Sequence, residues 1–281
     1  MKMHSNNQEK ATPRAGVESP VVPGTILPRQ AWPGMTPAVP PTSEGAGHHL
    51  RDYFLPRGMS DADLECLESL ALNRRKVRSA QTLYREGDPF VFVYLVRSGT
   101  LKSSLAMADG GERVNGFYMA GELTGLDAVA YGRHASSATA LEDTEVSAIP
   151  YAQLAKLAAG NADMQGLVAR LMSREIVREH SHALLSQLRA EGRLAAFLLN
   201  LSRRLKARGY SLSEFHLRMT RADIGSYLGL KLETVSRTFS IFQQQRLLEV
   251  NARHIHIIDR DALTRVFETH AHDDAWQKPE R

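Results

Sequence analysis

Short apolar segments alternate with glycine-containing turns between Lys76 and Pro150. The turn signals are Gly87-Asp88, Ser98-Gly99, Asp109-Gly110-Gly111, Gly121 and Gly132. The segments between them are rich in β-branched and aromatic residues and include Phe90–Val96, Leu101–Leu105 and Val114–Tyr118. Short strands at regular spacing, separated by glycine turns, predict an antiparallel roll or barrel.

Apolar residues at helical spacing precede and follow this region. A short helix is predicted from Ser60, which can act as its N-cap, to about Leu72, with an apolar side formed by Leu64, Leu67 and Leu70. A longer helix without proline is predicted from Asp163 to about Leu188. One of its faces follows alternating four-and-three spacing, as in a two-stranded coiled coil, at Met172, Ile176, Glu179, Ala183 and Ser186. A second face, suited to packing on the rest of the chain, carries Leu167, Leu171, Leu184, Leu185 and Leu188.

The two faces of the long helix favour a parallel homodimer over the alternative of a core helix in a monomer. The dimerisation residues are then Met172, Ile176, Glu179 and Ala183. Glu179 would face its symmetry mate, where two carboxylates repel each other and are costly to desolvate. We therefore expect Glu179 to keep the dimer weak.

Two short helices joined by a tight turn are predicted within residues 220–245. Thr220 stands before the first helix with Asp223 three residues later, so each side chain can bond a free N–H at the helix start. The apolar face of this helix is formed by Ile224, Tyr227 and Leu228. Gly229 supplies the left-handed residue that ends the helix and turns the chain.

The second of these helices begins near Lys231 or Leu232. Its buried face is formed by Val235, Phe239 and Phe242, and its other face by Glu233, Ser236, Arg237 and Ser240. In a helix-turn-helix, the first turns of the second helix point into the major groove. There arginine can bond guanine, glutamate can accept from cytosine, and serine can bond either kind of base edge. The predicted base contacts are Glu233, Ser236 and Arg237; the predicted further DNA contacts are Thr220, Arg221, Lys231, Thr234 and Ser240. The alternative is an ordinary solvated helix face.

The flanking segments complete a winged helix-turn-helix. An earlier helix has a core side formed by Leu194, Phe197, Leu198 and Leu201. Its basic residues are expected in solvent or near the DNA backbone, and they are Arg203, Arg204, Lys206 and Arg208. Behind the second helix, Leu247–Val250 and His254–Ile258 outline a hairpin, and a last helix is expected from Asp259 to about His270.

Composition narrows the class of protein. Among the 281 residues no apolar run is long enough to cross a membrane and no secretory signal is present, so we expect a cytoplasmic protein. Residues 1–47 hold 8 of the 12 prolines and predict a disordered tail. Residues 189–268 hold 14 Lys and Arg against 8 Asp and Glu, a surplus of 6 that fits phosphate binding. No nucleophile–base set, phosphate loop or metal-ligand spacing indicates an enzyme or a metal site.

The run MTRADIGSYLGLKLETVSR resembles the helix-turn-helix signature of the Crp/Fnr family of bacterial transcription regulators. The spacing of Glu233, Ser236 and Arg237 is most similar to its FNR branch, the fumarate and nitrate reduction regulators. Two stretches, YREGDPFVFVYLVRSGTLKSS and GELTGLDAVAYG, resemble the family's cyclic-nucleotide-type β-roll. GRLAAFLLNLSRRLKARGYS is again similar to the FNR branch. The resemblance extends over most of residues 50–270.

Pattern and resemblance together imply an α+β chain in five parts. These are a disordered tail at 1–47, a β-roll sensor domain at 48–160, a dimerisation helix at 161–190, a winged helix-turn-helix at 191–270 and a C-terminal tail at 271–281. The resemblance implies a homodimer on double-stranded DNA, at an inverted repeat like TTGAT-N4-ATCAA, with RNA polymerase as a further partner. It leaves both activation and repression open.

The resemblance also permits a comparison of the roll's ligand site. In cyclic-nucleotide receptors of this fold, a Glu directly after a Gly binds the ribose, and an Arg followed by Ser or Thr about eleven residues on binds the phosphate. Counted from Gly125, these positions hold Leu126 and Ser136-Ser137, and Arg133 is out of register. A cyclic phosphate would lose its charged partner, so cyclic AMP and cyclic GMP are not expected as ligands.

The FNR branch senses oxygen through an iron–sulfur cluster held by cysteine thiolates. Phe54 and Ser147 stand at two of its ligand positions, and Cys66 is the only cysteine, expected to be structural rather than redox-active. No cluster and no other cofactor is therefore predicted. His48-His49 and His134 could in principle bind haem or a metal, but surface histidines are favoured. A haem- or cyclic-nucleotide-responsive regulator of the same fold is the alternative.

Overall fold

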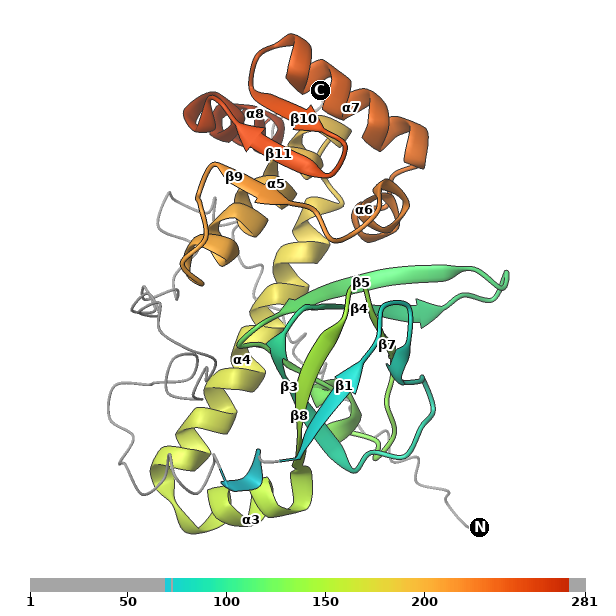
Figure 1. Cartoon of the computed structure of the whole chain (residues 1–281), viewed down its shortest axis with the longest axis vertical. Helices are drawn as coiled ribbons and strands as arrows, with labels where there is room; N and C mark the ends of the chain where they lie inside the picture. The colour runs from blue at the N-terminus through green and yellow to red at the C-terminus, as the bar shows by residue number, and fades with distance from the viewer. Residues whose placement is uncertain (1–68, 72, 273–281) are drawn as a thin grey trace, which may run out of the picture. The chain divides into compact units, whose positions relative to one another are not determined.

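The computed structural model describes residues 69–71 and 73–272 (Figure 1). The predictions for the tail at 1–47, for His48-His49, Phe54 and Cys66, and for most of the helix from Ser60 lie outside these residues. No helix among the described residues is long and apolar enough to span a bilayer.

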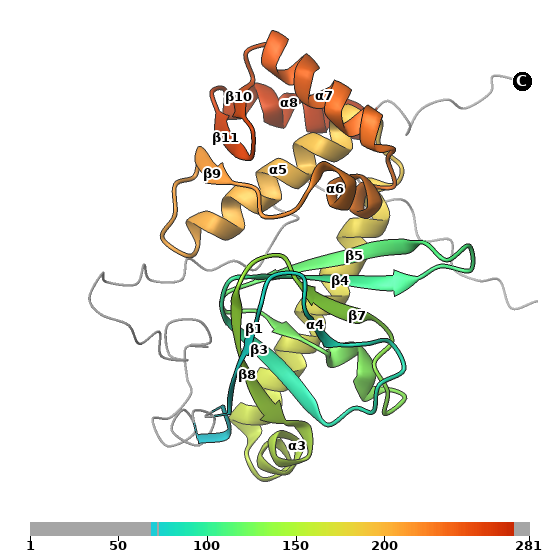
Figure 2. The same cartoon turned by 45° about the vertical axis from the view of Figure 1, so that its right-hand side comes forward.

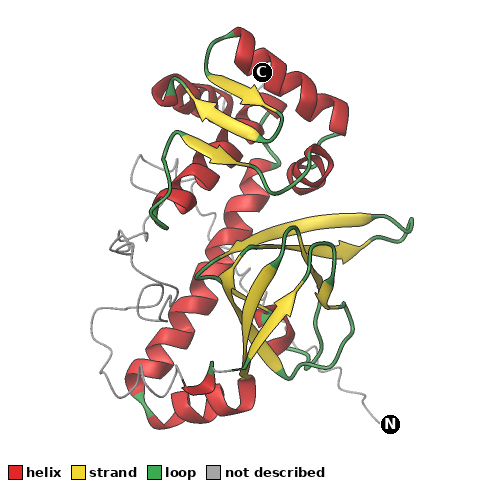
Figure 3. Ribbon diagram, viewed as in Figure 1, coloured by secondary structure: helices red, strands yellow, loops and turns green. Residues whose placement is uncertain are grey.

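The first part of the described chain is a β-roll of two antiparallel sheets (Figure 3). One sheet has the order β1-β8-β3-β6, with bounds Arg74–Val77, Thr144–Pro150, Phe92–Ser98 and Leu123–Thr124. The other has the order β2-β7-β4-β5, with bounds Thr82–Tyr84, Ser137–Ala140, Thr100–Ala106 and Glu112–Met119. A single 3-10 turn, Leu126–Val129, follows β6. The predicted antiparallel roll is confirmed.

Gly99, between β3 and β4, shows why glycine turns mark the strands. Its φ is 83°, in the left-handed region, and an added Cβ would lie 2.4 Å from Oγ1 of Thr144 in β8. Only glycine allows the chain to reverse here so close to the neighbouring strand.

Two helices follow the roll, α3 (Tyr151–Gly160) and α4 (Ala162–Leu185). Asn161 caps α4 by accepting from the backbone N–H groups of Asp163 and Met164 at 2.9 and 3.0 Å. The predicted long helix is present but ends at Leu185, three residues earlier than expected. Ser186, assigned to the dimer face, is the C-cap residue of α4.

Side-chain exposure along α4 separates the two predicted faces. Leu167, Leu185 and Leu188 are buried, as expected for the packing face. Leu184 was assigned to that face wrongly, because it is 49% exposed. On the predicted dimer face, Met172 is half-buried and Ile176, Glu179 and Ala183 are exposed.

The last part of the chain is a helical domain with a small sheet. Its elements are α5 (Ala190–Lys206), β9 (Glu214–His216), α6 (Arg221–Leu228), α7 (Leu232–Gln244), β10 (Leu248–Asn251), β11 (His254–Ile257) and α8 (Arg260–His272). The predicted hairpin is β10–β11, and β9, which the sequence did not indicate, adds a third strand beside β11. The core is formed by side chains from α5, α6, α7 and α8, among them Leu194, Leu198, Ile224, Phe242 and Leu263. Helix α8 extends to His272, two residues into the predicted C-terminal tail.

Candidate DNA interface

The start of α6 has the predicted cap. Oγ1 of Thr220 accepts from the backbone N–H of Asp223 at 3.0 Å, and the Asp223 carboxylate accepts from the backbone N–H of Thr220 at 2.9 Å. Two N–H groups that would otherwise lack partners are satisfied reciprocally. The cap therefore fixes where the helix-turn-helix begins.

The turn between α6 and α7 depends on two glycines. Gly229 has a φ of 65°, the left-handed conformation that the sequence predicts. Gly225 was not singled out from the sequence. Its carbonyl accepts from the Leu230 N–H at 2.8 Å, and an added Cβ would lie 2.6 Å from the Leu230 carbonyl oxygen. The spacing of these two glycines, one helical turn apart, is the signal that could have identified Gly225.

Helix α7 has the predicted division into a buried and an exposed face. Val235, Phe239 and Phe242 are at most 3% exposed. The exposed residues on the other face are Lys231 (the N-cap), Glu233, Ser236, Arg237 and Ser240, and Thr234 is half-buried. Residues 233, 236, 237 and 240 lie one and two turns apart, so they share one side of the helix. This side offers a carboxylate, two hydroxyls and a guanidinium.

Arg221 differs from the other predicted DNA contacts because its guanidinium is partly buried. Its Cζ lies 3.3 Å from the centroid of the Phe239 ring, a cation–π contact between α6 and α7. Burial lowers the pKa of Arg221 to about 10, and within the described chain its Nη1 has no hydrogen-bond partner. Arg221 therefore also holds the two helices together. A hollow of about 150 Å³ beside it is lined by Leu217, Met219, Thr220, Arg221, Ala252 and Arg253.

Helix α6 is also bonded to the roll, and both views draw it beside β5 (Figure 1; Figure 2). Nζ of Lys102 in β4 lies 3.1 Å from Asp223 and 3.1 Å from Glu112. Oγ of Ser226 accepts from the Val114 N–H at 2.9 Å and donates to the Glu112 carbonyl at 3.2 Å. Burial alone would raise the pKa of Asp223, but its bonds to Thr220 and Lys102 lower it.

The same architecture occurs in known proteins. Residues 192–266 match the Crp-like helix-turn-helix domain, and residues 74–161 match the cyclic nucleotide-binding domain. The chain is 44% identical over 228 residues to the transcriptional regulatory protein Btr of Bordetella pertussis, covering 79% of this chain and 94% of that protein. The chain belongs to the Crp/Fnr family.

Other relatives of this Crp/Fnr regulator point the same way. It is 41% identical over 230 residues to the fumarate and nitrate reduction regulatory protein of Escherichia coli, covering 80% of this chain and 92% of that protein. The structure of FixK2 from Bradyrhizobium japonicum matches with a TM-score of 0.64 and 31% identity, covering 69% of this chain and 96% of that chain. The chain is therefore a DNA-binding transcription regulator and not an enzyme, as predicted.

Four residues before Gly125, the roll of this Crp/Fnr regulator contains a Gly-Glu pair, Gly121-Glu122. Glu122 lies in the turn between β5 and β6, and its carboxylate binds arginines. It accepts from Arg204 at 2.6 and 3.1 Å and from Arg208 at 2.5 Å. The Arg178 guanidinium is 3.9 Å away.

These contacts correct the prediction for two arginines of the C-terminal domain. The side chains of Arg204 and Arg208 are only 13% and 12% exposed, so neither lies in solvent or is free to contact DNA. Burial by itself raises the pKa of Glu122, but the positive charges of Arg204, Arg208 and Arg178 hold it well below its ordinary value. The partner carboxylate is more than 80 residues away in sequence, which is why the pattern of α5 alone did not reveal it.

A second carboxylate, Asp127, belongs to the 3-10 turn Leu126–Val129, and its side chain is 31% exposed. Its Oδ2 accepts from the Ser136 hydroxyl at 2.8 Å and from the Ala135 N–H at 3.1 Å. Nδ1 of His134 is 3.8 Å from its Oδ1. Burial raises the pKa of Asp127, but the neighbouring His134 ring, the Ser136 hydroxyl and the Ala135 N–H lower it further than burial raises it. The donors that surround Asp127 are those that could otherwise hold an external anion.

His134 is not the surface histidine that the sequence favours. It is 3% exposed, its ring stacks on Tyr84 at a centroid distance of 3.8 Å, and Phe90 meets it edge-on at 5.7 Å. Arg133, the nearest arginine, donates instead to the Gly87 carbonyl at 2.8 Å. Two rings and a carboxylate thus already surround the His134 side chain.

Ser147 and the grouping of possible metal ligands bear on the cofactor prediction. Ser147, at a position where the FNR branch has a cluster ligand, is fully buried, and its hydroxyl accepts from Nε of Arg97 at 2.7 Å. Within residues 69–71 and 73–272 no three His, Cys, Asp or Glu side chains are grouped to hold a metal ion.

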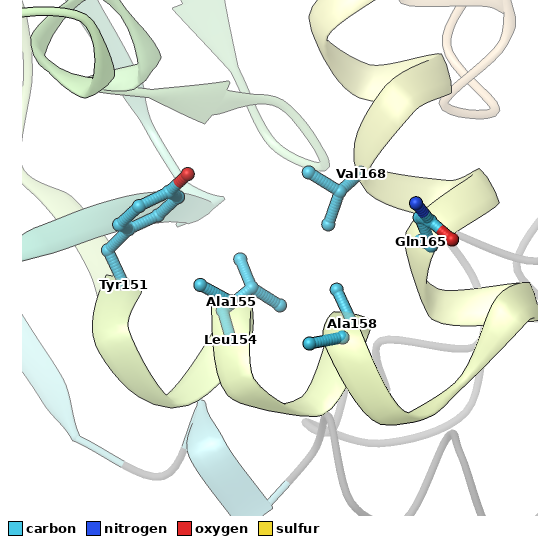
Figure 4. Close-up of a pocket in the computed structure, with 7 residues that line it drawn as sticks. Tyr151, Leu154, Ala155, Ala158, Gln165 and Val168 are labelled. Carbon is cyan, nitrogen blue, oxygen red and sulfur yellow. The ribbon is translucent and has the colours of Figure 1, made fainter.

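A largely apolar hollow of about 250 Å³ lies between α3 and α4, where Tyr151, Leu154, Ala158 and Val168 line it (Figure 4). None of its lining residues belongs to α7.

Proposed function

We propose that this regulator binds DNA as a homodimer, with α7 of each subunit reading one half of an inverted repeat that resembles TTGAT-N4-ATCAA. The observation that carries the proposal is the exposed side of α7. Glu233, Ser236 and Arg237 are exposed together, although the opposite side of the same helix is at most 3% exposed. Arg237 would bond a guanine, Glu233 would accept from a cytosine, and Ser236 would bond an adjacent base edge.

The charge of Glu233 supports base reading rather than phosphate binding alone. A carboxylate within the first turn of α7 would be repelled by the DNA backbone. It is useful only if it lies within hydrogen-bond distance of a base amino group. Lys231, Thr234, Ser240 and Thr220, which lie on or beside the same helix, would then contact phosphates and fix the register.

The test is a change of Arg237 to alanine, measured by fluorescence anisotropy on the inverted repeat and on random duplex at one salt concentration. We expect Arg237→Ala to lose roughly 1–3 kcal/mol on the inverted repeat and to relax the choice at one guanine, with a small change on random DNA. Arg246→Ala is the charge-matched control, because Arg246 is exposed but lies beyond the other end of α7. An equal loss on both duplexes would make Arg237 a phosphate contact and refute base reading.

The homodimer part of the proposal is supported by exposed apolar side chains on α4. Ile176 and Val177 are 55% and 51% exposed, and Leu184, two turns further on, is 49% exposed. Large apolar side chains aligned on one helix and open to water are typical of an interface. A second copy of α4, related by a two-fold axis, would cover them and set the two α7 helices at the two half-sites.

We further propose that the roll controls DNA binding without a cyclic nucleotide, a haem or an iron–sulfur cluster, and that the bound dimer contacts RNA polymerase. Asp127 already uses the Ser136 and Ala135 donors, and Glu122 is already bound to Arg204 and Arg208. Calorimetry with cyclic AMP and an absorbance spectrum of anaerobically purified protein test this. Heat of binding or a Soret band would refute the absence of these ligands. For the polymerase, equal binding of RNA polymerase to the inverted-repeat DNA with and without the dimer would refute the proposed contact.

A further inference from the structure

The last carbonyls of α6 are bonded from outside the helix. The Tyr227 carbonyl accepts from Nε2 of His182 in α4 at 2.5 Å. The Leu228 and Gly229 carbonyls accept from Nη1 of Arg193 in α5 at 2.9 and 3.5 Å. Carbonyls at the end of a helix have no partner within it and carry the negative end of the helix dipole, so a guanidinium stabilises them.

The same guanidinium also holds the end of α4. Nε of Arg193 donates to the Leu188 carbonyl at 2.7 Å, and its Nη2 donates to the Ser186 carbonyl at 2.5 Å. Ser186 is the C-cap of α4, and Leu188 lies in the link to α5. A single planar side chain therefore joins the C-terminal ends of α4 and α6.

His182 strengthens this junction. Its ring stacks on the Tyr227 ring with a centroid distance of 4.3 Å and an interplanar angle of 25°. Since His182 belongs to the last turn of α4, it fixes the rotation of that helix against α6 in addition to the distance between their ends. Neither His182 nor Arg193 belongs to the exposed side of α7.

We infer that Arg193, with His182, is the positioning residue that sets the direction of α7 relative to α4. Only Gly229, Leu230 and Lys231 separate the held end of α6 from the start of α7, so a shift at the held carbonyls moves the recognition helix. In a dimer formed along α4, that direction fixes the separation of the two recognition helices. Arg193 therefore selects the spacing between half-sites. This inference rests on the proposed dimer.

The Arg193 guanidinium is a planar fork of donors, Nε, Nη1 and Nη2, and this makes the inference testable. Lysine keeps the positive charge at the two helix ends, but it is a point charge without the planar set of donors that orients three or more carbonyls at once. Arg193→Lys should therefore fold and keep much of its thermal stability while losing spacing selectivity. Arg193→Met removes both the charge and the fork.

The experiment measures the affinity of the full-length dimer for four duplexes. Three carry the inverted repeat with spacers of three, four and five base pairs, and the fourth carries a single half-site. We expect the wild type to prefer one spacer, and Arg193→Lys and Arg193→Met to bind that duplex at least tenfold more weakly while the single half-site changes less than twofold. Arg189→Met is the matched control, because Arg189 is an exposed arginine four residues earlier, at the N-cap of α5.

Two outcomes would overturn the inference. One is an unchanged spacer preference in both Arg193 variants. The other is an equal loss on all four duplexes together with a lowered melting temperature in both, which would make Arg193 a purely structural residue. A wild type that binds the three spacers equally would instead refute the proposed dimer on an inverted repeat, and the inference with it.

Discussion

Replacing Glu122 by glutamine should destabilise the folded protein by about 3–5 kcal/mol, the cost of removing one partner from a buried ion pair. The carboxylate accepts from Arg204, from Arg208 and from the Met119 N–H at 3.0 Å. Glutamine has nearly the same shape, but it carries no charge and turns an amino group toward guanidinium donors. The two arginines, 13% and 12% exposed, would then be buried without a counter-charge.

The assay is urea unfolding followed by circular dichroism at fixed protein concentration, since dimerisation would shift apparent stability. Glu145→Gln is the matched control. Glu145 pairs with Arg74 at 3.5 Å, but the Arg74 side chain is 58% exposed, so the loss should stay below about 1 kcal/mol.

The effect of Glu122→Gln should also depend on pH. The pKa of Glu122 in the folded protein is held well below the value of about 4.3 found in unfolded chains. The ionised group therefore contributes its full stabilisation above that value, and the contribution is lost as the pH falls toward the folded pKa. The difference between wild type and variant should be largest near neutral pH and shrink below about pH 4. A loss under 1 kcal/mol at neutral pH, or a difference independent of pH, would refute the role assigned to this carboxylate.

Three other substitutions are expected to give defined results. Gly225→Ala should cost about 1–3 kcal/mol of stability and weaken DNA binding, because the added Cβ would lie 2.6 Å from the Leu230 carbonyl oxygen. Gly160→Ala, with open space around the added Cβ, is the control, and equal melting temperatures of the two variants would contradict the prediction. Asp127→Asn should lower the melting temperature at pH 7 more than at pH 4, because a carboxyl with a lowered pKa loses its stabilising effect as the pH falls; an equal shift at both pH values would refute this. Glu179→Ala should shift sedimentation toward dimer and raise affinity for the inverted repeat, and an unchanged monomer–dimer balance would count against a repulsive carboxylate at the interface.

Local signals explain why the helix-turn-helix could be predicted. The Thr220–Asp223 cap and the left-handed Gly229 are encoded within a few residues of the features they determine. The buried positions of α7 follow the helical repeat, so Val235 and Phe239 were placed correctly. The strands of the roll could also be predicted from the sequence, because glycine turns separate them.

Long-range contacts explain what the sequence did not reveal. No glycine or proline marks the end of α4 at Leu185; the chain turns there with its carbonyls held by Arg193, a tertiary contact. Arg204 looks like any solvated residue of an amphipathic helix until Glu122 is brought to it from the roll. Strand β9 has only 3 residues, too few for a periodic pattern.

Because Glu122 of the roll is shared by Arg204 and Arg208, the loss of the carboxylate and the loss of one arginine have unequal consequences. Loss of one arginine leaves Glu122 with other cations, whereas loss of Glu122 leaves both Arg204 and Arg208 without a counter-charge, and Arg178 alone keeps Glu175. Substitutions among relatives should therefore follow an order. Relatives that lack one of these arginines can keep the acid, whereas relatives that lack the acid should also lack Arg204 or Arg208. The order of such replacements among relatives would record how the roll and the DNA-binding domain have stayed joined.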